Sequence, residues 1–305
     1  MKTAAKRVVK IALQSSLARR IMARLRLTHW LFAPPGHFYS PIPALNDVRN
    51  DEQRIFPPMP RELPGIALDE AQQLAMLDQL QAYYDSQPFR IEKVPNLRYF
   101  FENPMYSYSD AIFLHCMIRY ARPRQIIEVG SGYSSCVILD TNEVFFNNRI
   151  TCTFVDPFTQ VLRTLLHEDD FRRIEILDCR LQDVTLDRFR SLEANDILFI
   201  DSTHVAKIGS DVNYIFAEIL PVLRRGVYVH FHDIFYPFEY PKEWIYKGCA
   251  WNEAYLLRAF LTFNQTYEIV LFNTFLECFH RERFVHTMPL CLKNEGGSIW
   301  LRRVA

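Results

Sequence analysis

Two pairs of Asp and His residues follow two apolar segments of this chain. The segment DILFIDSTH places Asp201 at the end of one apolar run and His204 three residues later, and GVYVHFHD ends in His232 and Asp233. If the two runs are neighbouring parallel strands, their carboxyl ends meet at one edge of a sheet and these side chains converge there. An imidazole with a pKa near 6.5 can remove a proton from a hydroxyl. The pattern therefore predicts His204 as a catalytic base beside Asp201, or a metal site formed by Asp201, His232 and Asp233.

A glycine turn follows an earlier apolar run, in the segment QIIEVGSGYSS. Gly130 and Gly132 lie in the turn, and Glu128 lies at the end of the run before it. Such a turn between a strand and a helix lets a ligand approach the backbone near free N–H groups. The third glycine of the dinucleotide fingerprint is missing, which disfavours a pyrophosphate at this helix start. An acid in the strand instead suits the ammonium group of an amino-acid-like ligand.

A second carboxylate ends the next apolar run, in FVDPF. Asp156 can accept hydrogen bonds from both hydroxyls of a ribose, or it can cap the helix expected after it. Together with the glycine turn, the first alternative predicts a nucleoside ligand.

The elements that must position these residues alternate regularly after Pro123. Five short apolar runs are separated by stretches of helical character, and two further strand-like runs, YEIVLFN and GSIWLRR, close the chain. Strands that alternate with helices predict an α/β fold, a doubly wound and mostly parallel sheet covered by helices on both faces.

The composition divides the chain further. Eight of the seventeen prolines lie between residues 34 and 64, which argues against regular helix there. Helical periodicity begins at Leu68 and appears again over 109–121. Ser109 and Asp110 are candidate N-cap residues of the second helix. We predict five parts, which are a basic amphipathic helix over 1–32, a Pro-rich arm over 33–66, a helical part over 67–122, a catalytic domain over 123–305, and within it an aromatic insertion over 234–257.

Charge and cysteine content indicate the environment of the chain. Residues 1–46 contain eight basic and no acidic side chains, whereas the whole chain balances 35 against 35. The basic helix could dock on an anionic membrane surface or pack against a partner. Seven scattered cysteines without a CxxC motif predict buried, reduced thiols, and no apolar run is long enough to span a bilayer. We expect a cytoplasmic protein, with peripheral contact to a membrane as one use of the basic helix.

With these motifs in place, the chain resembles class I S-adenosylmethionine-dependent methyltransferases, of the family-24 type, over about residues 88–305. The resemblance implies a seven-stranded sheet that ends in an antiparallel hairpin. It implies that S-adenosylmethionine is bound by the glycine turn, by Asp156 and by the loop after the third strand. The cofactor-binding residues it points to are Glu128, Gly130, Gly132, Tyr133, Ser134, Asp156 and Gln182.

The resemblance also bears on the reaction. Cation-dependent O-methyltransferases carry an Asp at the position of Asp201 and an acid–amide or acid–acid pair at the position of His232 and Asp233. Because Mg²⁺ prefers oxygen ligands, the imidazole in this pair favours a metal such as Mn²⁺, Fe²⁺ or Zn²⁺ if a divalent ion is used. The setting of the family implies O-methylation of a saccharide or other small molecule, and we expect no nucleic-acid partner.

The insertion over 234–257 contains eight large aromatic side chains. They could stack on the acceptor, or they could form a packed subdomain or an oligomer interface. Two other functions stay open at this point. A metal-dependent hydroxylase or oxygenase would use Asp201, His232 and Asp233 and need Fe²⁺ and O₂, and a non-catalytic module would bind the cofactor without a reactive cluster.

Overall fold

The computed structural model describes residues 32–305, which belong to two compact units. The smaller unit contains the described residues up to Pro58 together with Ile245–Ala250, and the larger is Met59–Trp244 with Trp251–Ala305. The basic helix predicted over 1–32 lies outside the described residues except for Phe32. Across the described part of the chain, no helix combines the length and the apolar character that crossing a bilayer requires.

The smaller unit contains helix that the proline content did not predict. Helices α3 (Leu45–Asn50) and α4 (Glu52–Ile55) occupy the proline-free stretch between Pro43 and Pro57. The expectation that the arm has no regular helix is wrong there, because proline excludes helix only around its own position. Within this unit, the Tyr246 hydroxyl donates to Glu52, and the guanidinium of Arg49 lies 5.4 Å from the centre of the Tyr246 ring.

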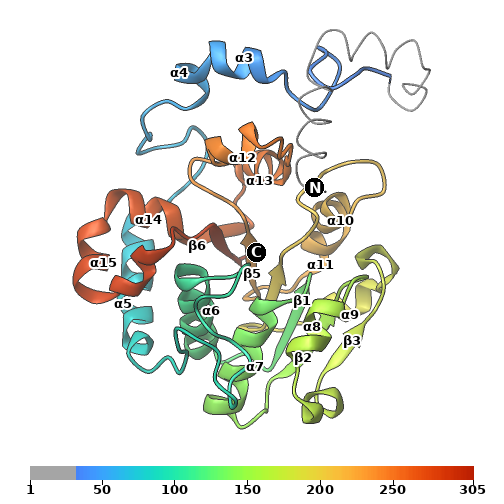
Figure 1. Ribbon diagram of the computed structural model, residues 1–305, viewed down its shortest axis with the longest axis vertical. Helices are drawn as coiled ribbons and strands as arrows, with labels where there is room; N and C mark the ends of the chain where they lie inside the picture. Colours follow the sequence, from blue (N-terminus) through green and yellow to red (C-terminus); the bar gives the residue numbers. More distant parts are fainter. Residues whose placement is uncertain (1–31) are drawn as a thin grey trace, which may run out of the picture. The chain divides into compact units, whose positions relative to one another are not determined.

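The larger unit is built on one sheet of seven strands (Figure 1). The strands are β1 (Gln125–Val129), β2 (Thr151–Val155), β3 (Glu175–Leu177), β4 (Ile197–Ile200), β5 (Tyr228–His232), β6 (Tyr267–Phe272) and β7 (Ser298–Arg303). Their order in the sheet is β3-β2-β1-β4-β5-β7-β6, with β1 to β5 parallel and β7 antiparallel to both of its neighbours. The predicted mostly parallel sheet with a closing antiparallel hairpin is confirmed.

Helices cover the sheet on both sides (Figure 1). On one side α5 (Glu70–Tyr84) packs on α6 (Tyr108–Ala121), α6 packs on α7 (Tyr133–Phe146), and α7 packs on α8 (Gln160–Leu165). On the other side α9 (Leu186–Arg190) packs with a series of three consecutive segments, which are α10 (Asp211–Tyr214), the π-helix η3 (Ile215–Ile219) and α11 (Leu220–Val222). The remaining helical segments are α12 (Lys242–Tyr246), α13 (Glu253–Leu261), α14 (Asn273–Phe279), α15 (Arg281–Thr287), η1 (Glu168–Arg172), η2 (Leu181–Asp183) and η4 (Pro289–Lys293).

Helix α6 differs in detail from its prediction. It begins at Tyr108 and its N-cap position is Ser107, so the predicted caps Ser109 and Asp110 lie inside the helix, where both are buried. The cysteine prediction holds for part of the set, since Cys116, Cys136, Cys152 and Cys291 are buried whereas Cys278 is exposed.

A buried ion cluster fixes the segment before α6 to the helices around it. Arg98 is 2% exposed, and its guanidinium bonds Asp140 on α7 at 2.7 Å and Asp170 on η1 at 2.6 Å. Asp140 also accepts hydrogen bonds from the backbone N–H groups of Arg98 and Tyr99. The two carboxylates are almost wholly buried, so Arg98 is the charge that makes their burial tolerable.

Replacement of Arg98 tests this role. Arg98→Met keeps an apolar stem but leaves Asp140 and Asp170 without their counter-charge, and we expect it to lower the free energy of unfolding by about 3–5 kcal/mol. The matched control is Arg124→Met, because Arg124 pairs with Glu193 where both side chains are about half exposed or more, at 68% and 48%. That pair should contribute at most about 1 kcal/mol. Urea denaturation of both variants measures the difference, and equal losses would contradict the structural role of Arg98.

Candidate active site at the carboxyl edge of the sheet

The register of three adjacent strands brings the predicted motifs to one edge. Val129 at the end of β1 pairs with Val155 at the end of β2 and with Ile200 at the end of β4. The residues that follow these strand ends are Gly130, Asp156 and Asp201, so they leave the sheet at the same level. The sequence-predicted glycine turn and the acids after the second and fourth strands thus lie side by side.

Gly130 occupies a position that no other residue fits. Its φ is +82°, and a Cβ added there would lie 2.0 Å from the carbonyl oxygen of Asp201. A Cβ on Gly132, in contrast, would have no atom within 4 Å. The turn therefore contacts the loop after β4 on one side and is open at Gly132 on the other.

The acid before the turn is fully buried. Glu128 accepts hydrogen bonds from the hydroxyls of Ser134 and Ser135 at the start of α7, and Ser135 in turn accepts one from the N–H of Gly132. Burial raises the pKa of Glu128 to about 8, against the opposing effect of the two serine hydrogen bonds. Glu128 and Ser134 thus hold the shape of the turn. Direct contact of either residue with a cofactor stays a prediction.

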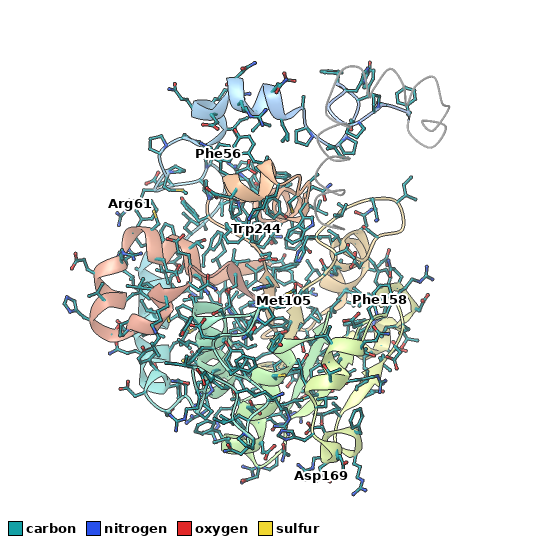
Figure 2. All side chains as sticks on the ribbon, in the orientation of Figure 1. Phe56, Arg61, Met105, Phe158, Asp169 and Trp244 are labelled. Atoms are coloured by element: carbon teal, nitrogen blue, oxygen red, sulfur yellow. The ribbon has the colours of Figure 1, made fainter. Side chains whose placement is uncertain are left out.

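Asp156 does not cap the helix after it. Its carboxylate accepts hydrogen bonds from the Ser131 hydroxyl at 2.8 Å and from the backbone N–H of Phe158 at 2.7 Å, and the N-cap position of α8 is Thr159. Of the two roles considered for Asp156, helix capping is not what the structure shows. The carboxylate is half-buried beside the turn, and the exposed Phe158 lies on the same loop (Figure 2).

The two remaining predicted cofactor residues lie at the borders of this edge. Tyr133 is the first residue of α7, half-buried, with its ring 5.9 Å from that of Phe100. Gln182 lies in η2 and donates to the carbonyl of Gly209 at 2.7 Å, which ties the loop after β3 to the loop after β4. Their contact with a cofactor stays a prediction.

Three potential metal ligands converge beyond the ends of β4 and β5. They are Asp201, His204 and Asp233, and one ligand atom from each lies within 4.8 Å of the other two. His204 Nε2 is 3.2 Å from Asp201 Oδ1 and 3.6 Å from Asp233 Oδ2. His204 and Asp233 both have left-handed backbones, with φ of +58° and +56°. This conformation costs energy in residues other than glycine and is enriched at active sites.

His232 stands beside this group rather than in it. Its Nε2 is 3.7 Å from Asp233 Oδ1, and its Nδ1 is buried without a hydrogen-bond partner among the described residues. The metal set predicted from the sequence is Asp201, His232 and Asp233. In the structure His204 takes the place of His232, because the left-handed turn at His204 brings that imidazole to the carboxylates. Burial alone would lower the pKa of His232, but charge on Asp233 and Asp201 outweighs it and raises the pKa, and the ring packs 5.0 Å from the Tyr106 ring.

The electrostatics of the group favour positive charge. Burial alone would lower the pKa of His204, but hydrogen bonds and charge from Asp201 and Glu253 outweigh it and raise the value to about 10. Burial alone would raise the pKa of Asp201, but the imidazoles of His232 and His204 hold it below its usual range. Burial raises the pKa of Asp233 despite the same imidazoles. Below about pH 10 the surrounding carboxylates favour the protonated, cationic imidazole of His204, and the role of His204 as a catalytic base stays a prediction.

Sequence reasoning missed Glu253, the third carboxylate on His204. It lies at the first residue of α13, is fully buried, and its Oε2 is 2.9 Å from His204 Nδ1. No spacing rule links it to a residue 49 positions earlier in the chain. Its one signal was its place, two residues after Trp251, in the aromatic insertion over 234–257, whose side chains could stack on the acceptor.

The aromatic insertion contributes a wall next to His204. The Trp251 ring lies 4.3 Å from the imidazole, and the Trp244 ring stands edge-on to Trp251 at 5.4 Å. The Phe235 ring packs edge-on against the ring of Trp244, with 5.3 Å between the ring centres (Trp244 is labelled in Figure 2). Trp244, Trp251 and Phe235 are only half-buried, so part of their ring surface is open to a ligand.

Comparison with known proteins gives two sequence matches. A family model described as a methyltransferase domain matches residues 127–234, which run from β1 through β5 and include every residue of the three-ligand group. An uncharacterized protein of Archaeoglobus fulgidus is 36% identical over 169 residues, which cover 54% of this chain and 75% of that protein.

Solved structures with related architecture are more distant. The O-methyltransferase TomG from Streptomyces achromogenes, in complex with S-adenosylmethionine, is 14% identical, with 85% of this chain and 96% of that chain covered and a TM-score of 0.44. An O-methyltransferase from Bacillus cereus is 13% identical, with 84% and 97% covered and a TM-score of 0.40. Similarity at this level carries no argument about the reaction of this chain.

The contact between Gly130 and Asp201 generates a test of the site. Gly130→Ala adds a methyl group against a backbone carbonyl and also forces a side chain into a left-handed backbone. Gly209→Ala is the matched control, because Gly209 has a φ of +70° but no atom within 4 Å of an added Cβ. The control should lose about 1–2 kcal/mol of unfolding free energy, and Gly130→Ala at least twice as much. Similar losses in urea denaturation would show that the two loops are not in close contact.

Proposed function

We propose that this chain, which matches a methyltransferase-domain model over residues 127–234, is a class I S-adenosylmethionine-dependent methyltransferase that methylates a hydroxyl group of a saccharide or similar small molecule with the help of a divalent cation. The observation that carries the proposal is the convergence of Asp201, His204 and Asp233 directly beside the glycine turn.

The residues of this edge suit the methyl donor. The turn is open at Gly132, the N-terminus of α7 starts at Tyr133, and the Asp156 carboxylate is half-buried on the adjacent strand end. We propose that Asp156 accepts the ribose hydroxyls and that the turn faces the amino-acid end of S-adenosylmethionine. The sulfonium would then lie toward the loop after β4, where Asp201 begins the reactive group.

The grouped ligands also fit a cation. Two carboxylates and one imidazole form a mixed oxygen and nitrogen set, which suits Mn²⁺, Fe²⁺ or Zn²⁺ better than Mg²⁺. When bound, such an ion supplies a Lewis acid that acidifies a coordinated hydroxyl. In the reaction, the acceptor oxygen would form a bond to the methyl carbon, the sulfur–carbon bond would break with its electron pair going to sulfur, and the proton of the hydroxyl would be released to solvent water. The protein positions the reactants and supplies a local charge. Holding the reactants in line can lower the activation free energy by about 7–11 kcal/mol.

The aromatic wall supports a ring-shaped acceptor. Half-buried faces of Trp244 and Trp251 next to His204 are the type of surface that stacks on the apolar face of a sugar or on a phenol. The match to a methyltransferase-domain model disfavours the alternative hydroxylase. A purely cofactor-binding module would have no need for the three-ligand group. Docking of the basic segment over 1–32 at a membrane would place the enzyme near lipid-linked saccharides.

His204 is the residue through which this function can be tested. We expect transfer of labelled methyl from S-adenosylmethionine to a panel of mono- and disaccharides in the presence of Mn²⁺. His204→Ala should lower that transfer at least 100-fold without changing the affinity for S-adenosylhomocysteine. His286→Ala, which replaces an exposed histidine on α15, is the control and should have no effect. Transfer that survives both EDTA and His204→Ala would contradict the proposal, and label found only on phenols would contradict the saccharide acceptor.

A further inference from the structure

The second nitrogen of His204 has a dedicated partner. Glu253 Oε2 lies 2.9 Å from His204 Nδ1, and Glu253 Oε1 accepts a hydrogen bond from the Ser202 hydroxyl at 3.0 Å. Both oxygens of this fully buried carboxylate therefore bond side chains of the loop that carries the imidazole. Because a carboxylate can only accept, Nδ1 must carry a hydrogen, and when a cation takes the place of the second hydrogen the lone pair is on Nε2. Nε2 is then the nitrogen that faces Asp201 and Asp233.

The backbone reinforces the same arrangement. The carbonyl oxygen of His204 accepts hydrogen bonds from the N–H groups of Asn252 and Glu253 at 3.0 and 3.1 Å. The Asn252 side chain accepts another from the N–H of Ala206 at 2.6 Å. The start of α13 is therefore joined to the loop after β4 on both sides of His204, and these bonds hold its left-handed backbone in place.

We propose that Glu253 is a positioning residue for the cation site: it fixes the tautomer and the plane of the His204 imidazole so that Nε2 is presented to a divalent ion. The inference rests on the cation site of the proposed function. Metal-binding histidines commonly donate their other N–H to a carboxylate, and loss of that partner typically weakens metal binding about 10- to 100-fold. Trp251 against the imidazole face restricts the ring further.

The competing explanation is that Glu253 only stabilises the start of α13. An acid at the first residue of a helix interacts favourably with the helix dipole. The side chain of Glu253, however, is engaged with His204 and Ser202 rather than with the N–H groups of its own helix. A helix role would change stability and leave the cation affinity alone, so the two explanations differ in what they predict.

Titration with Mn²⁺ separates them. Calorimetry on the full chain saturated with S-adenosylhomocysteine should show that Glu253→Gln binds Mn²⁺ about 10- to 100-fold more weakly than the wild type, because an amide can donate to Nδ1 and stabilise the wrong tautomer. Its affinity for S-adenosylhomocysteine should stay within twofold, which shows that the variant is folded. Glu253→Asp keeps a shorter carboxylate and should retain part of the Mn²⁺ affinity.

Glu239→Gln is the matched control. Glu239 lies in the same aromatic insertion and accepts a hydrogen bond from the Tyr255 hydroxyl, but it has no contact with the three-ligand group among the described residues. Its Mn²⁺ affinity should equal that of the wild type. Wild-type affinity in Glu253→Gln would overturn the positioning role alone. Absence of Mn²⁺ binding by the wild type would instead overturn the cation site itself, and the positioning role with it.

Discussion

The site depends on the absence of a side chain at Gly130. A Cβ at this position would lie 2.0 Å from the carbonyl oxygen of Asp201, so the turn after β1 and the loop after β4 can approach only because the residue is glycine. On the β1 side of this contact lies the turn that we propose binds the methyl donor. On the β4 side lies Asp201, the first of the three proposed metal ligands. One steric constraint therefore sets the distance between the turn and the three-ligand group, and the register of β1, β2 and β4 brings Asp156 to the same level.

A second constraint is electrostatic. Asp201, Asp233 and Glu253 surround a single imidazole, and burial penalises each uncompensated carboxylate. In the protein alone a protonated His204, whose pKa is raised to about 10, offsets part of this negative charge. A divalent cation would take over that role and return the Nε2 lone pair to use as a ligand. The same group that looks like a base in the sequence is thus better suited, once its surroundings are known, to binding a cation.

The sequence predicted the fold more fully than the site. All seven strands lie within the segments expected from their apolar runs, because buried parallel strands carry a strong local signal. The glycine turn, Asp156 and the pair of Asp201 and Asp233 follow directly from those strand ends. The choice of His204 over His232 does not, since it depends on a left-handed backbone at His204. Glu253 and Arg98 find their partners tens of residues away, and such contacts leave no trace in local spacing.

If the turn after β1 and Asp156 bind S-adenosylmethionine, calorimetric titration with S-adenosylhomocysteine shows it most directly. We expect saturable binding by the wild type that weakens about 10- to 150-fold in Asp156→Ala, as for loss of about 1.5–3 kcal/mol from hydrogen bonds to a charged group. Asp169→Ala, which removes an exposed carboxylate on η1 (Figure 2), should bind as the wild type does. No binding by the wild type, with or without Mn²⁺, would contradict the account.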